Sequence, residues 1–449
     1  MFSKLLIANR GEIARRINTV AQGLGLKTVA VYSDADAGLP FVKEATEAVR
    51  LGPAPAKDSY LNAAAILQAL KSTGAEAVHP GYGFLSENAE FARAVAETGA
   101  KWVGPPPEAM ARMKDKSEAR KLAAAAGVPI VPGTPTTVPD VATALSEAER
   151  IGYPVLCKAA GGGGGIGMAV ANTPAELEKG FTACVNRAQA AFGRSAVYLE
   201  RYFPAPRHLE VQILGDHHGN LLHVLERECS IQRRHQKVVE EAGAPLFLDG
   251  SLEPLRQQMF DAALKAARAF GYANAGTVEL LYSDGQVYFI EMNARLQVEH
   301  PVTELTTGVD LIGWQLRIAA GEKLTLKQSD LKRTGHAIEL RVYAEDPVKF
   351  FPSPGPLNVY RPPSGEGVRL DSGYAQGDVV TPNYDPMIAK LIVSGKDRGQ
   401  AIERAQRAVG DFAIEGIKHN LPLHLRILKD PVFQSGQLST RFLEQHAKP

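Results

Sequence analysis

The sequence has little cysteine, almost no net charge and no long apolar run. Its three cysteines, Cys157, Cys184 and Cys229, have no CxxC spacing, which excludes a disulfide framework and a zinc site of the usual kind. We therefore expect reduced thiols and a cytoplasmic location. The formal net charge of +1 favours neither nucleic acid nor a membrane surface as a partner. No stretch approaches the ~20 apolar residues that span a bilayer, and the short run from Leu5 to Ala8 predicts a first strand rather than a signal peptide.

The composition is that of a globular protein, with 45% hydrophobic and 22% charged residues among 449. This length suits about two to four domains. Strand and helix patterns alternate over about the first hundred residues, which predicts a parallel, doubly wound sheet. A single helix is expected from about Pro107 through Ala126. Strands become frequent after Pro204, and the last part, from about Gly335, mixes strands with a helix at 398–412.

A glycine run at 161–165 is the most prominent local signal. It follows the strand-like Pro154–Lys158 and precedes strand-like residues from Met168 on, so it fits neither a Rossmann turn nor a Walker loop. Phosphate oxygens must approach backbone N–H groups closely, and a Cβ would block that approach. We interpret the run as a flap over phosphates, with Lys158 near the α- and β-phosphates. The alternative interpretation is a disordered linker.

An acidic hairpin around Asp284–Gly285 suits a divalent metal. If the outgoing strand stays extended, one face carries five alternate residues. They are Val287, Phe289, Glu291, Asn293 and Arg295. Two carboxylates and an amide oxygen suit magnesium, provided that Glu279 of the incoming strand joins that face. The alternative is a surface charge ladder.

The hairpin register decides where Glu279 points. A two-residue turn pairs Glu279 with Ile290 and places it on the face opposite to Glu291. A three-residue loop, Ser283 to Gly285 with a left-handed glycine, pairs Glu279 with Phe289 and unites the two glutamates. We predict the three-residue loop with a glycine bulge, and a tight two-residue turn would contradict the metal assignment.

The segment from Arg227 to Lys237 is dense in cations. This composition suits a triphosphate and a small anion. Gln232 and His235 are candidates for ribose hydroxyls or phosphate, and Lys237 for a place beside the γ-phosphate.

A candidate oxyanion site follows the metal strand. Arg295 offers a planar fork that matches a carboxylate or bicarbonate. Glu299 is a candidate base whose pKa nearby cations would lower and burial would raise, and the sequence leaves open which effect is larger. The alternative role for Glu299 is a salt bridge to Arg295. We expect His300 to be a structural histidine.

Several long motifs occur in order along the whole chain. They are residues 7–14 (IANRGEIA), 79–88 (HPGYGFLSEN), 233–241 (RRHQKVVEE), 291–301 (EMNARLQVEHP) and 384–390 (YDPMIAK). In these motifs the sequence resembles biotin carboxylase, the ATP-grasp subunit of biotin-dependent carboxylases. The resemblance implies an N-terminal Rossmann-like domain at 1–114, an ATP-grasp domain at 115–330 with a lid at about 132–203, and a mixed α+β domain at 331–449.

The resemblance also implies roles for individual residues. Expected ATP contacts are Lys116, Lys158, Gly163, Gly164, Gly165, Met168, Glu200, Arg201, Phe203, His208, Gln232, His235, Glu279 and Leu281, with Glu200 to Phe203 as the adenine hinge. Expected ligands of Mg²⁺ or Mn²⁺ are Glu279, Glu291 and Asn293. The expected bicarbonate site is Lys237, Arg295, Gln297, Val298 and Glu299. The expected catalytic residues are Glu299 as base, Arg341, Arg295 and Lys237, with Arg341 also binding biotin.

The implied reaction uses ATP as co-substrate to convert bicarbonate to carboxyphosphate and carboxylates biotin carried on a separate protein. Met113-Lys114 lies in a predicted helix and is not a biotin-acceptor motif, so we expect the carrier protein and the carboxyltransferase to be separate chains. We expect a homodimer that serves an acyl-CoA carboxylase, acetyl-CoA carboxylase of fatty acid synthesis being the first expectation.

Three positions depart from the family pattern. Ile166 and Ala169 stand where cations are common in and after the glycine loop, and Gly243 replaces a frequent proline. The lost cations predict a weaker hold on nucleotide.

Two alternatives remain. The first is another ATP-grasp ligase, joining a carboxylate to an amine, against which the motifs at 232–241 and Arg341 argue. The second is an inactive ATP-binding regulatory protein, against which the intact set of base, metal ligands and Arg341 argues.

Overall fold

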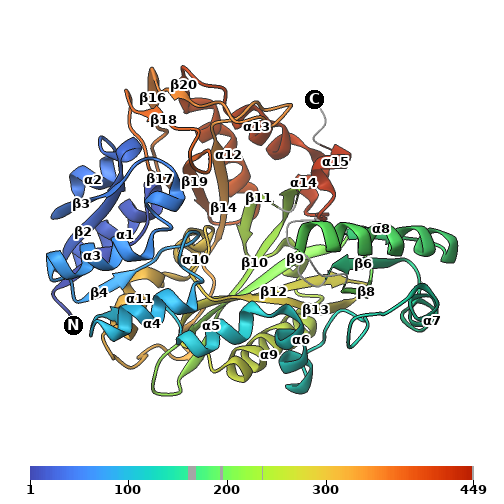
Figure 1. Cartoon of the computed structure of the whole chain (residues 1–449). Coiled ribbons are helices and arrows are strands. Elements are labelled where there is room, and N and C mark those ends of the chain that lie inside the picture. The colour runs from blue at the N-terminus through green and yellow to red at the C-terminus, as the bar shows by residue number, and fades with distance from the viewer. Residues whose placement is uncertain (160–167, 193–195, 235, 447–449) are drawn as a thin grey trace.

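The computed structural model describes residues 1–159, 168–192, 196–234 and 236–446. The N-terminal unit is a five-stranded sheet in the order β3-β2-β1-β4-β5, in which all neighbouring strands are parallel (Figure 1). Its strands are β1 (Lys4–Ile7), β2 (Lys27–Ser33), β3 (Glu47–Gly52), β4 (Ala77–His79) and β5 (Lys101–Trp102).

Helices cover both faces of this sheet. One face packs against α1 (Gly11–Gly23), next to which lies α2 (Pro40–Glu44), and the other packs against α3 (Ala63–Thr73) and α4 (Ala89–Glu97). Apolar residues alternate along the strands, so that Leu5 and Ile7 face α1 while Leu6 and Ala8 face α3 and α4. The predicted doubly wound parallel sheet is confirmed.

An antiparallel sheet of eight strands forms the centre of the molecule, in the order β13-β12-β9-β10-β11-β14-β19-β17 (Figure 1). The strands are β9 (Arg207–Gly215), β10 (Leu221–Arg233), β11 (Gln236–Ala242), β12 (Asn274–Ser283), β13 (Gln286–Asn293), β14 (His336–Tyr343), β17 (Val368–Ser372) and β19 (Met387–Gly395). Because β11 pairs with β14, one sheet contains strands from both sides of position 330, the expected end of the ATP-grasp domain.

Helices pack on the central sheet at several places. The β9–β13 side packs against α5 (Pro107–Lys114), α6 (Lys116–Ala125) and α9 (Glu253–Phe270).

The predicted single helix at 107–126 is wrong, because it is broken at Asp115. Asp115 has extended backbone angles, and its Oδ1 accepts a hydrogen bond of 3.0 Å from the Glu118 N–H, which starts α6 as an N-cap.

A small unit of three strands stands beside the central sheet. Its antiparallel order is β7-β6-β8, with β6 at Val155–Ala159, β7 at Met168–Ala171 and β8 at Val197–Arg201. Helices α7 (Val141–Ile151) and α8 (Pro174–Phe192) complete a separate small core. The predicted strands on either side of the glycine run are confirmed, whereas the run itself lies outside the described residues.

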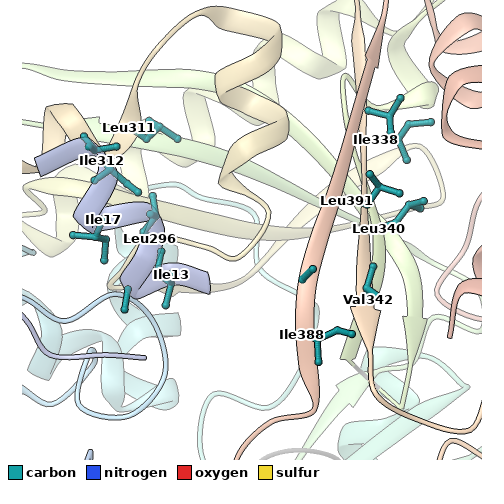
Figure 2. Close-up of a cluster of buried hydrophobic side chains, with 14 of the residues drawn as sticks. Ile13, Ile17, Leu296, Leu311, Ile312, Ile338, Leu340, Val342, Ile388 and Leu391 are labelled. Atoms are coloured by element: carbon teal, nitrogen blue, oxygen red, sulfur yellow. The ribbon is translucent and has the colours of Figure 1, made fainter. Parts of the chain in front are cut away.

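The large apolar core joins the N-terminal unit to the central sheet (Figure 2). On one side are Ile13 and Ile17 of α1 with Leu311 of α11 (Leu311–Ala319). On the other side are Leu340 of β14 and Leu391 of β19, which pair directly. Since successive strand residues alternate in direction, burying Leu340 in this core sends Arg341 to the opposite face, where α10 (His300–Thr307) packs.

The C-terminal part adds short ribbons and helices. They are β15 (Gly355–Pro356), β16 (Val359–Arg361), β18 (Val379–Val380), β20 (Ala413–Glu415), α12 (Arg398–Asp411), α13 (Leu421–Lys429), α14 (Pro431–Ser435) and α15 (Phe442–His446). The predicted helix at 398–412 is confirmed as α12. Among the helices of the described residues, none has both the length and the apolar character required to cross a membrane.

Candidate active site

The β12–β13 hairpin turns through two residues, Asp284 and Gly285. Both have positive φ angles, 53° and 75°, and Ser283 pairs with Gln286. Two left-handed residues are the signature of a tight type I′ turn. The predicted three-residue loop is therefore wrong.

A β-bulge further along the hairpin restores the shared face. Leu280 pairs with Phe289, but the next pair is Glu279 with Glu291, so β13 contains one extra residue, Ile290. Directly opposed residues point to the same face, and the two glutamates therefore lie side by side in spite of the tight turn.

The bulge also corrects the predicted alternation along β13. Val287 and Phe289 face the apolar core beneath α9, whereas Glu291 and Asn293 lie on the other face. The five alternate residues do not share one face, because the extra residue reverses the direction of side chains beyond it. The polar half of the strand therefore separates from the apolar half.

Glu279 is the centre of the candidate metal site. Its Oε1 accepts hydrogen bonds from Asn293 Nδ2 at 2.9 Å and Gln297 Nε2 at 3.0 Å, and its Oε2 lies 3.2 Å from His208 Nε2. Burial would raise the pKa of this carboxyl, but Lys237 and His208 hold it well below its usual range. Glu279 is thus an anion, as a carboxylate that ligates a metal must be.

The second carboxylate of this face is more exposed. Glu291 Oε2 lies 3.2 Å from Lys116 Nζ. Two carboxylates and an amide on one face of the hairpin form a donor set that suits magnesium. His208 and Glu210 also bring ligand atoms close to Glu279, but Arg227 and Lys237 already bind Glu210.

Lys237 of β11 joins three carboxylates. Its Nζ donates to Glu210 Oε2 at 2.6 Å, to Glu299 Oε1 at 2.6 Å and to Glu279 Oε1 at 3.1 Å. Burial would lower the pKa of this amine, but the three carboxylates raise it well above its ordinary value. Lys237 is therefore a permanent cation between the metal face and Glu299.

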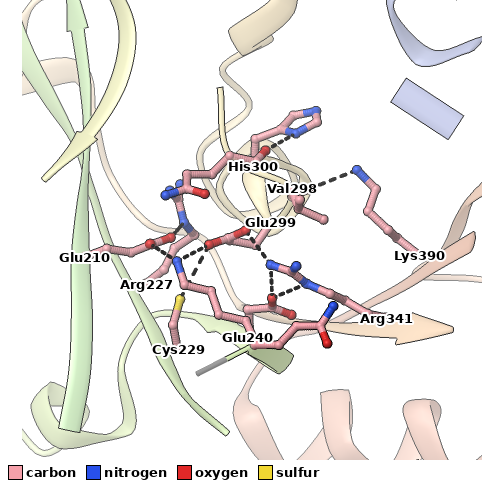
Figure 3. Close-up of polar contacts among 12 residues, drawn as sticks. Glu210, Arg227, Cys229, Glu240, Val298, Glu299, His300, Arg341 and Lys390 are labelled. Atoms are coloured by element: carbon pink, nitrogen blue, oxygen red, sulfur yellow. Dashed lines mark hydrogen bonds and ion pairs between the residues drawn. The ribbon is translucent and has the colours of Figure 1, made fainter. Parts of the chain in front are cut away.

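Glu299 lies at the start of α10 and is fully buried. Its Oε2 accepts a hydrogen bond of 2.9 Å from Arg341 Nη2, and Cys229 Sγ lies 3.9 Å from its Oε1 (Figure 3). Burial would raise the pKa of Glu299, but Lys237, Arg341 and Arg227 hold it well below its ordinary value. The question left open by the sequence is thus answered in favour of the nearby cations.

The alternative role for Glu299 was a salt bridge to Arg295. Within the described ranges Glu299 pairs with Lys237 and Arg341, and not with Arg295. Arg295 instead donates to Gln297 Oε1 at 2.8 Å and to Asn293 Oδ1 at 3.2 Å. The 295–299 segment thus places the guanidinium of Arg295 and the carboxylate of Glu299 at one site, and the two groups do not form an ion pair with each other.

Comparison with known proteins agrees with this geometry. Residues 1–110 match the family model "Biotin carboxylase, N-terminal domain", 339–445 match "Biotin carboxylase C-terminal domain", and 115–327 match "Carbamoyl-phosphate synthase L chain, ATP binding domain". The chain is 51% identical to the biotin carboxylase of Halalkalibacterium halodurans, over 100% of this chain and 98% of that one. The chain belongs to the biotin carboxylase family.

Solved structures of biotin carboxylases have the same fold. A Campylobacter jejuni biotin carboxylase described as a β,γ-ATP complex matches with a TM-score of 0.94 and 43% identity, over 99% of both chains. The biotin carboxylase domain dimer of Hydrogenobacter thermophilus 2-oxoglutarate carboxylase, described with MgADP, ADP and bicarbonate, matches with a TM-score of 0.92 and 45% identity, over 99% of this chain and 98% of that one. As a biotin carboxylase the chain is an ATP-dependent ligase.

The expected adenine hinge begins with the last two residues of β8. Glu200 binds both Lys158 and Arg120. The Arg201 N–H donates to Pro132 O at 2.7 Å, and the Phe203 ring stacks on Tyr288 with centroids 5.1 Å apart. The stack of Phe203 on Tyr288 holds the hinge against β13, the strand that carries Glu291.

Other expected nucleotide residues lie around the hinge and the metal face. Leu281 pairs with His208 and with Tyr288 across the sheet, and Met168 pairs with Lys158. Gln232 Nε2 lies 2.9 Å from His208 Nδ1. Gly163, Gly164, Gly165 and His235 lie outside the described residues, as does Ile166.

The departure at Gly243 has a visible role. A Cβ at Gly243 would overlap the guanidinium of Arg333, whose Nη1 lies 3.4 Å from Glu226 Oε1. The absence of a side chain therefore makes room for this arginine. Ala169 lies in β7.

Sequence reasoning missed four charged residues of this site. Arg227 is fully buried, binds Glu210 and donates to Gln212, Thr303 and Thr277. Glu240 accepts a hydrogen bond of 2.6 Å from Arg341 Nε. Lys390 belongs to the motif at 384–390, so its place there was a signal, and the alternation along β9 places Glu210 on the face opposite to Leu209 and Val211.

Proposed function

We propose that this biotin carboxylase carboxylates biotin carried on a separate protein, with Glu299 as the base that activates bicarbonate. The observation that supports this most is the convergence of Lys237 and Arg341 on the buried Glu299 carboxylate. Two fixed cations surround one ionised carboxylate. A small anion that binds beside them can therefore take over part of the interaction that the cations make with Glu299. Arg295, Gln297 and Val298 lie within the four residues before Glu299 and complete the proposed bicarbonate site.

Glu299 takes the proton of bicarbonate, and the resulting oxyanion attacks the γ-phosphorus of ATP as ADP leaves. Binding of an anion beside Lys237 and Arg341 offsets the charges that depress the pKa of Glu299, which makes it a stronger base when substrate is present. The carboxyphosphate formed breaks down to CO2 and phosphate. That phosphate takes the N1 proton of biotin, and biotin N1 then attacks CO2.

Arg341 stabilises the enolate that biotin forms when it loses this proton. Its guanidinium is fixed between Glu240 and Glu299, and such preorganised donors are typically worth about 2.7–4 kcal/mol each. Because the guanidinium is already oriented, little reorganisation is needed when the charge develops.

Glu279, Glu291 and Asn293 would hold Mg²⁺ or Mn²⁺, which supplies charge neutralisation at the phosphates. Lys116, Lys158 and His208 would contact the phosphates of ATP once their carboxylate partners release them. Gln232, Leu281, Met168 and the Glu200 to Phe203 hinge would form the remainder of the nucleotide site, with Gly163 to Gly165 and His235. The Hydrogenobacter domain described with MgADP and bicarbonate supports this combination of ligands.

The three functional units would be 1–114, 115–330 with the lid at about 132–203, and 331–449, which the three family matches support. The partners would be a biotin carboxyl carrier protein and a carboxyltransferase in the cytoplasm. A homodimer is supported by the dimer described for the Hydrogenobacter domain.

For the final acceptor we propose acetyl-CoA, as part of fatty acid synthesis. Relatives at 48% identity include one of the pyruvate carboxylase chains of Methanothermobacter thermautotrophicus and a mitochondrial methylcrotonoyl-CoA carboxylase chain of Arabidopsis thaliana. Product analysis after reconstitution with carrier and carboxyltransferase proteins, offered acetyl-CoA, methylcrotonoyl-CoA or pyruvate, separates the three acceptors.

The deciding experiment is ATP hydrolysis by the purified chain with magnesium, with and without bicarbonate and free biotin, beside Glu299→Gln. Stimulation by biotin that requires bicarbonate and disappears in the variant is the expected result. Hydrolysis in Glu299→Gln at the wild-type rate would contradict the role of Glu299. Hydrolysis that ignores biotin would instead point to an ATP-grasp ligase with an amine acceptor.

A further inference from the structure

Lys390 is a fully buried cation that contacts the backbone beside Glu299. Its Nζ donates a hydrogen bond of 2.9 Å to the carbonyl oxygen of Val298 (Figure 3). That oxygen belongs to the peptide that joins Val298 to Glu299. Nothing in the proposed chemistry uses Lys390, yet burying a charged amine is costly unless its contacts compensate for it.

The sheet explains how Lys390 reaches this peptide. Lys390 of β19 is the direct register partner of Arg341 of β14, and such partners point to the same face. Arg341 holds the carboxylate of Glu299, and Lys390 holds the preceding carbonyl. Two neighbouring cations therefore bind the same short segment. Arg341 binds the side chain of Glu299, and Lys390 binds the backbone carbonyl of Val298.

The start of α10 needs such an anchor. Glu299 occupies the N-cap position of this helix, but in the described part of the chain its side chain makes no capping hydrogen bond. The carboxylate points to Lys237 and Arg341 instead. The helix N-terminus thus gives up its usual side-chain cap, and the bond from Lys390 fixes the chain at the residue before it.

Two carboxylates hold Lys390 in place. Glu12 Oε2 lies 3.1 Å and Asp371 Oδ2 3.8 Å from its Nζ. Asp371 is the register partner of Lys390 on β17, and Glu12 comes from the first turn of α1 in the N-terminal unit. Lys390 therefore connects the N-terminal unit, the C-terminal strands and the Val298–Glu299 segment at one atom.

We propose that Lys390 is a positioning residue for the carboxylation reaction, whose ammonium fixes the Val298–Glu299 peptide and thereby the geometry of the bicarbonate site. This inference rests on the proposed function, in which Val298 and Glu299 belong to that site. A residue with this role affects the use of bicarbonate and leaves nucleotide binding intact. Among the described residues its contacts are to Val298, Glu12, Asp371 and the ring of Tyr82, and not to the adenine hinge or the metal face.

The test is Lys390→Met, whose unbranched side chain ends one bond short of Nζ and removes the donor and the charge. A hydrogen bond to a charged group is worth about 10-fold to 100-fold in an equilibrium. We therefore expect kcat/KM for bicarbonate, in biotin-dependent ATP hydrolysis, to fall at least about tenfold. The Kd for MgATP, measured by calorimetry, should stay within about twofold of wild type, since no nucleotide contact is removed.

Arg256→Met is the matched control. Arg256 on α9 is also a largely buried cation in an ion pair, 2.8 Å from Glu226, and it does not contact the 295–299 segment. The Arg256→Met variant should have lower thermal stability than the wild type and an unchanged kcat/KM for bicarbonate. If Lys390→Met does not fold, Lys390→Gln takes its place, because its amide nitrogen ends one bond short of the ammonium.

Unchanged kcat/KM for bicarbonate in the variant at Lys390 would overturn the proposal. An equal loss of MgATP affinity would overturn it too, because it would mean a general collapse of the site. Glu299→Gln, measured in parallel, keeps the two ideas apart. If that variant retains activity, the proposed base is wrong, whatever the variants of Lys390 do.

Discussion

Lys237 and Glu299 form an ion pair of 2.6 Å in which the carboxylate is fully inaccessible to solvent. Lys237 is also the cation with the largest effect in lowering the pKa of Glu299. The same lysine therefore ties the base to the metal face and sets the charge that the base carries. Several consequences can be measured.

Lys237→Gln should raise the pKa of Glu299, because removing a positive neighbour disfavours the ionised carboxylate. In the wild type this pKa lies well below its ordinary value, so Glu299 stays ionised throughout the neutral and mildly acidic range. In the variant, the acid limb of the kcat/KM profile for bicarbonate should move to higher pH. The rate at neutral pH should also fall by about 10²–10³, as when one charge-stabilising donor is lost.

The exposed Lys27→Gln serves as the control for loss of one positive charge, and its profile should match the wild type. An acid limb that stays in place in Lys237→Gln would show that Lys237 does not control the ionisation of Glu299.

Glu291→Gln should raise the concentration of free magnesium needed for half-maximal ATP hydrolysis by at least about tenfold, because a proposed anionic ligand becomes neutral. Asp284→Asn is a matched control on the same hairpin. It removes one carboxylate at the exposed turn and keeps a residue that tolerates positive φ. An equal magnesium requirement in Glu291→Gln and the wild type would contradict the metal assignment.

The hairpin also marks the limit of what the sequence could predict. Alternating strand and helix patterns were enough for the N-terminal sheet, and residue types were enough to choose Glu279 and Glu291. The bulge at Ile290 was not predictable, because it depends on a contact outside the hairpin. The Phe289 N–H donates to Pro129 O at 2.7 Å, a residue 160 positions earlier. Local turn chemistry therefore predicted the wrong loop length, although the prediction that Glu279 and Glu291 share one face was correct.

The same reasoning applies to the charged centre of the site. Glu299 was a candidate base because it follows Arg295 by four residues in the sequence, but its partners come from β11 and β14. The alternation along β9 places Glu210 on one face with His208 and Gln212, but only the packed sheet reveals that it contacts Lys237. Pairings between distant strands of this kind leave no periodic signal in one sequence.

Glu240→Gln tests the electrostatics on the other side of Arg341. Burial raises the pKa of Glu240 from 4.5 to about 7, although Arg341 lowers it. Since the pKa of the folded protein exceeds that of the unfolded chain, the folded protein binds the extra proton between these values. The stability from this proton is complete below about pH 4.5 and is lost as the pH rises through about 7.

The variant has no such proton, so its Tm should rise relative to the wild type between pH 5 and pH 8. The shift in pKa corresponds to about 3 kcal/mol, or roughly 3 °C for a chain of this size. Exposed Glu97→Gln is the control for the loss of one carboxylate at the surface. A constant difference for Glu240→Gln would mean that Glu240 titrates normally.

Arg227→Met should destabilise the protein more than any surface charge change, because it leaves Glu210 buried with one of its two cations missing. Arg227 is fully inaccessible and donates to Gln212, Thr303 and Thr277 besides its ion pair with Glu210. Breaking a buried pair by removing one partner costs about 3–5 kcal/mol, which lowers Tm by roughly 3–5 °C in a chain of this length. The Arg50–Asp34 pair is also short, at 2.6 Å, but exposed, so Arg50→Met should leave Tm nearly unchanged. Equal Tm values for the two variants would mean that Lys237 alone compensates Glu210, and that the buried arginine is dispensable for holding the β9–β10 pair beneath the active site.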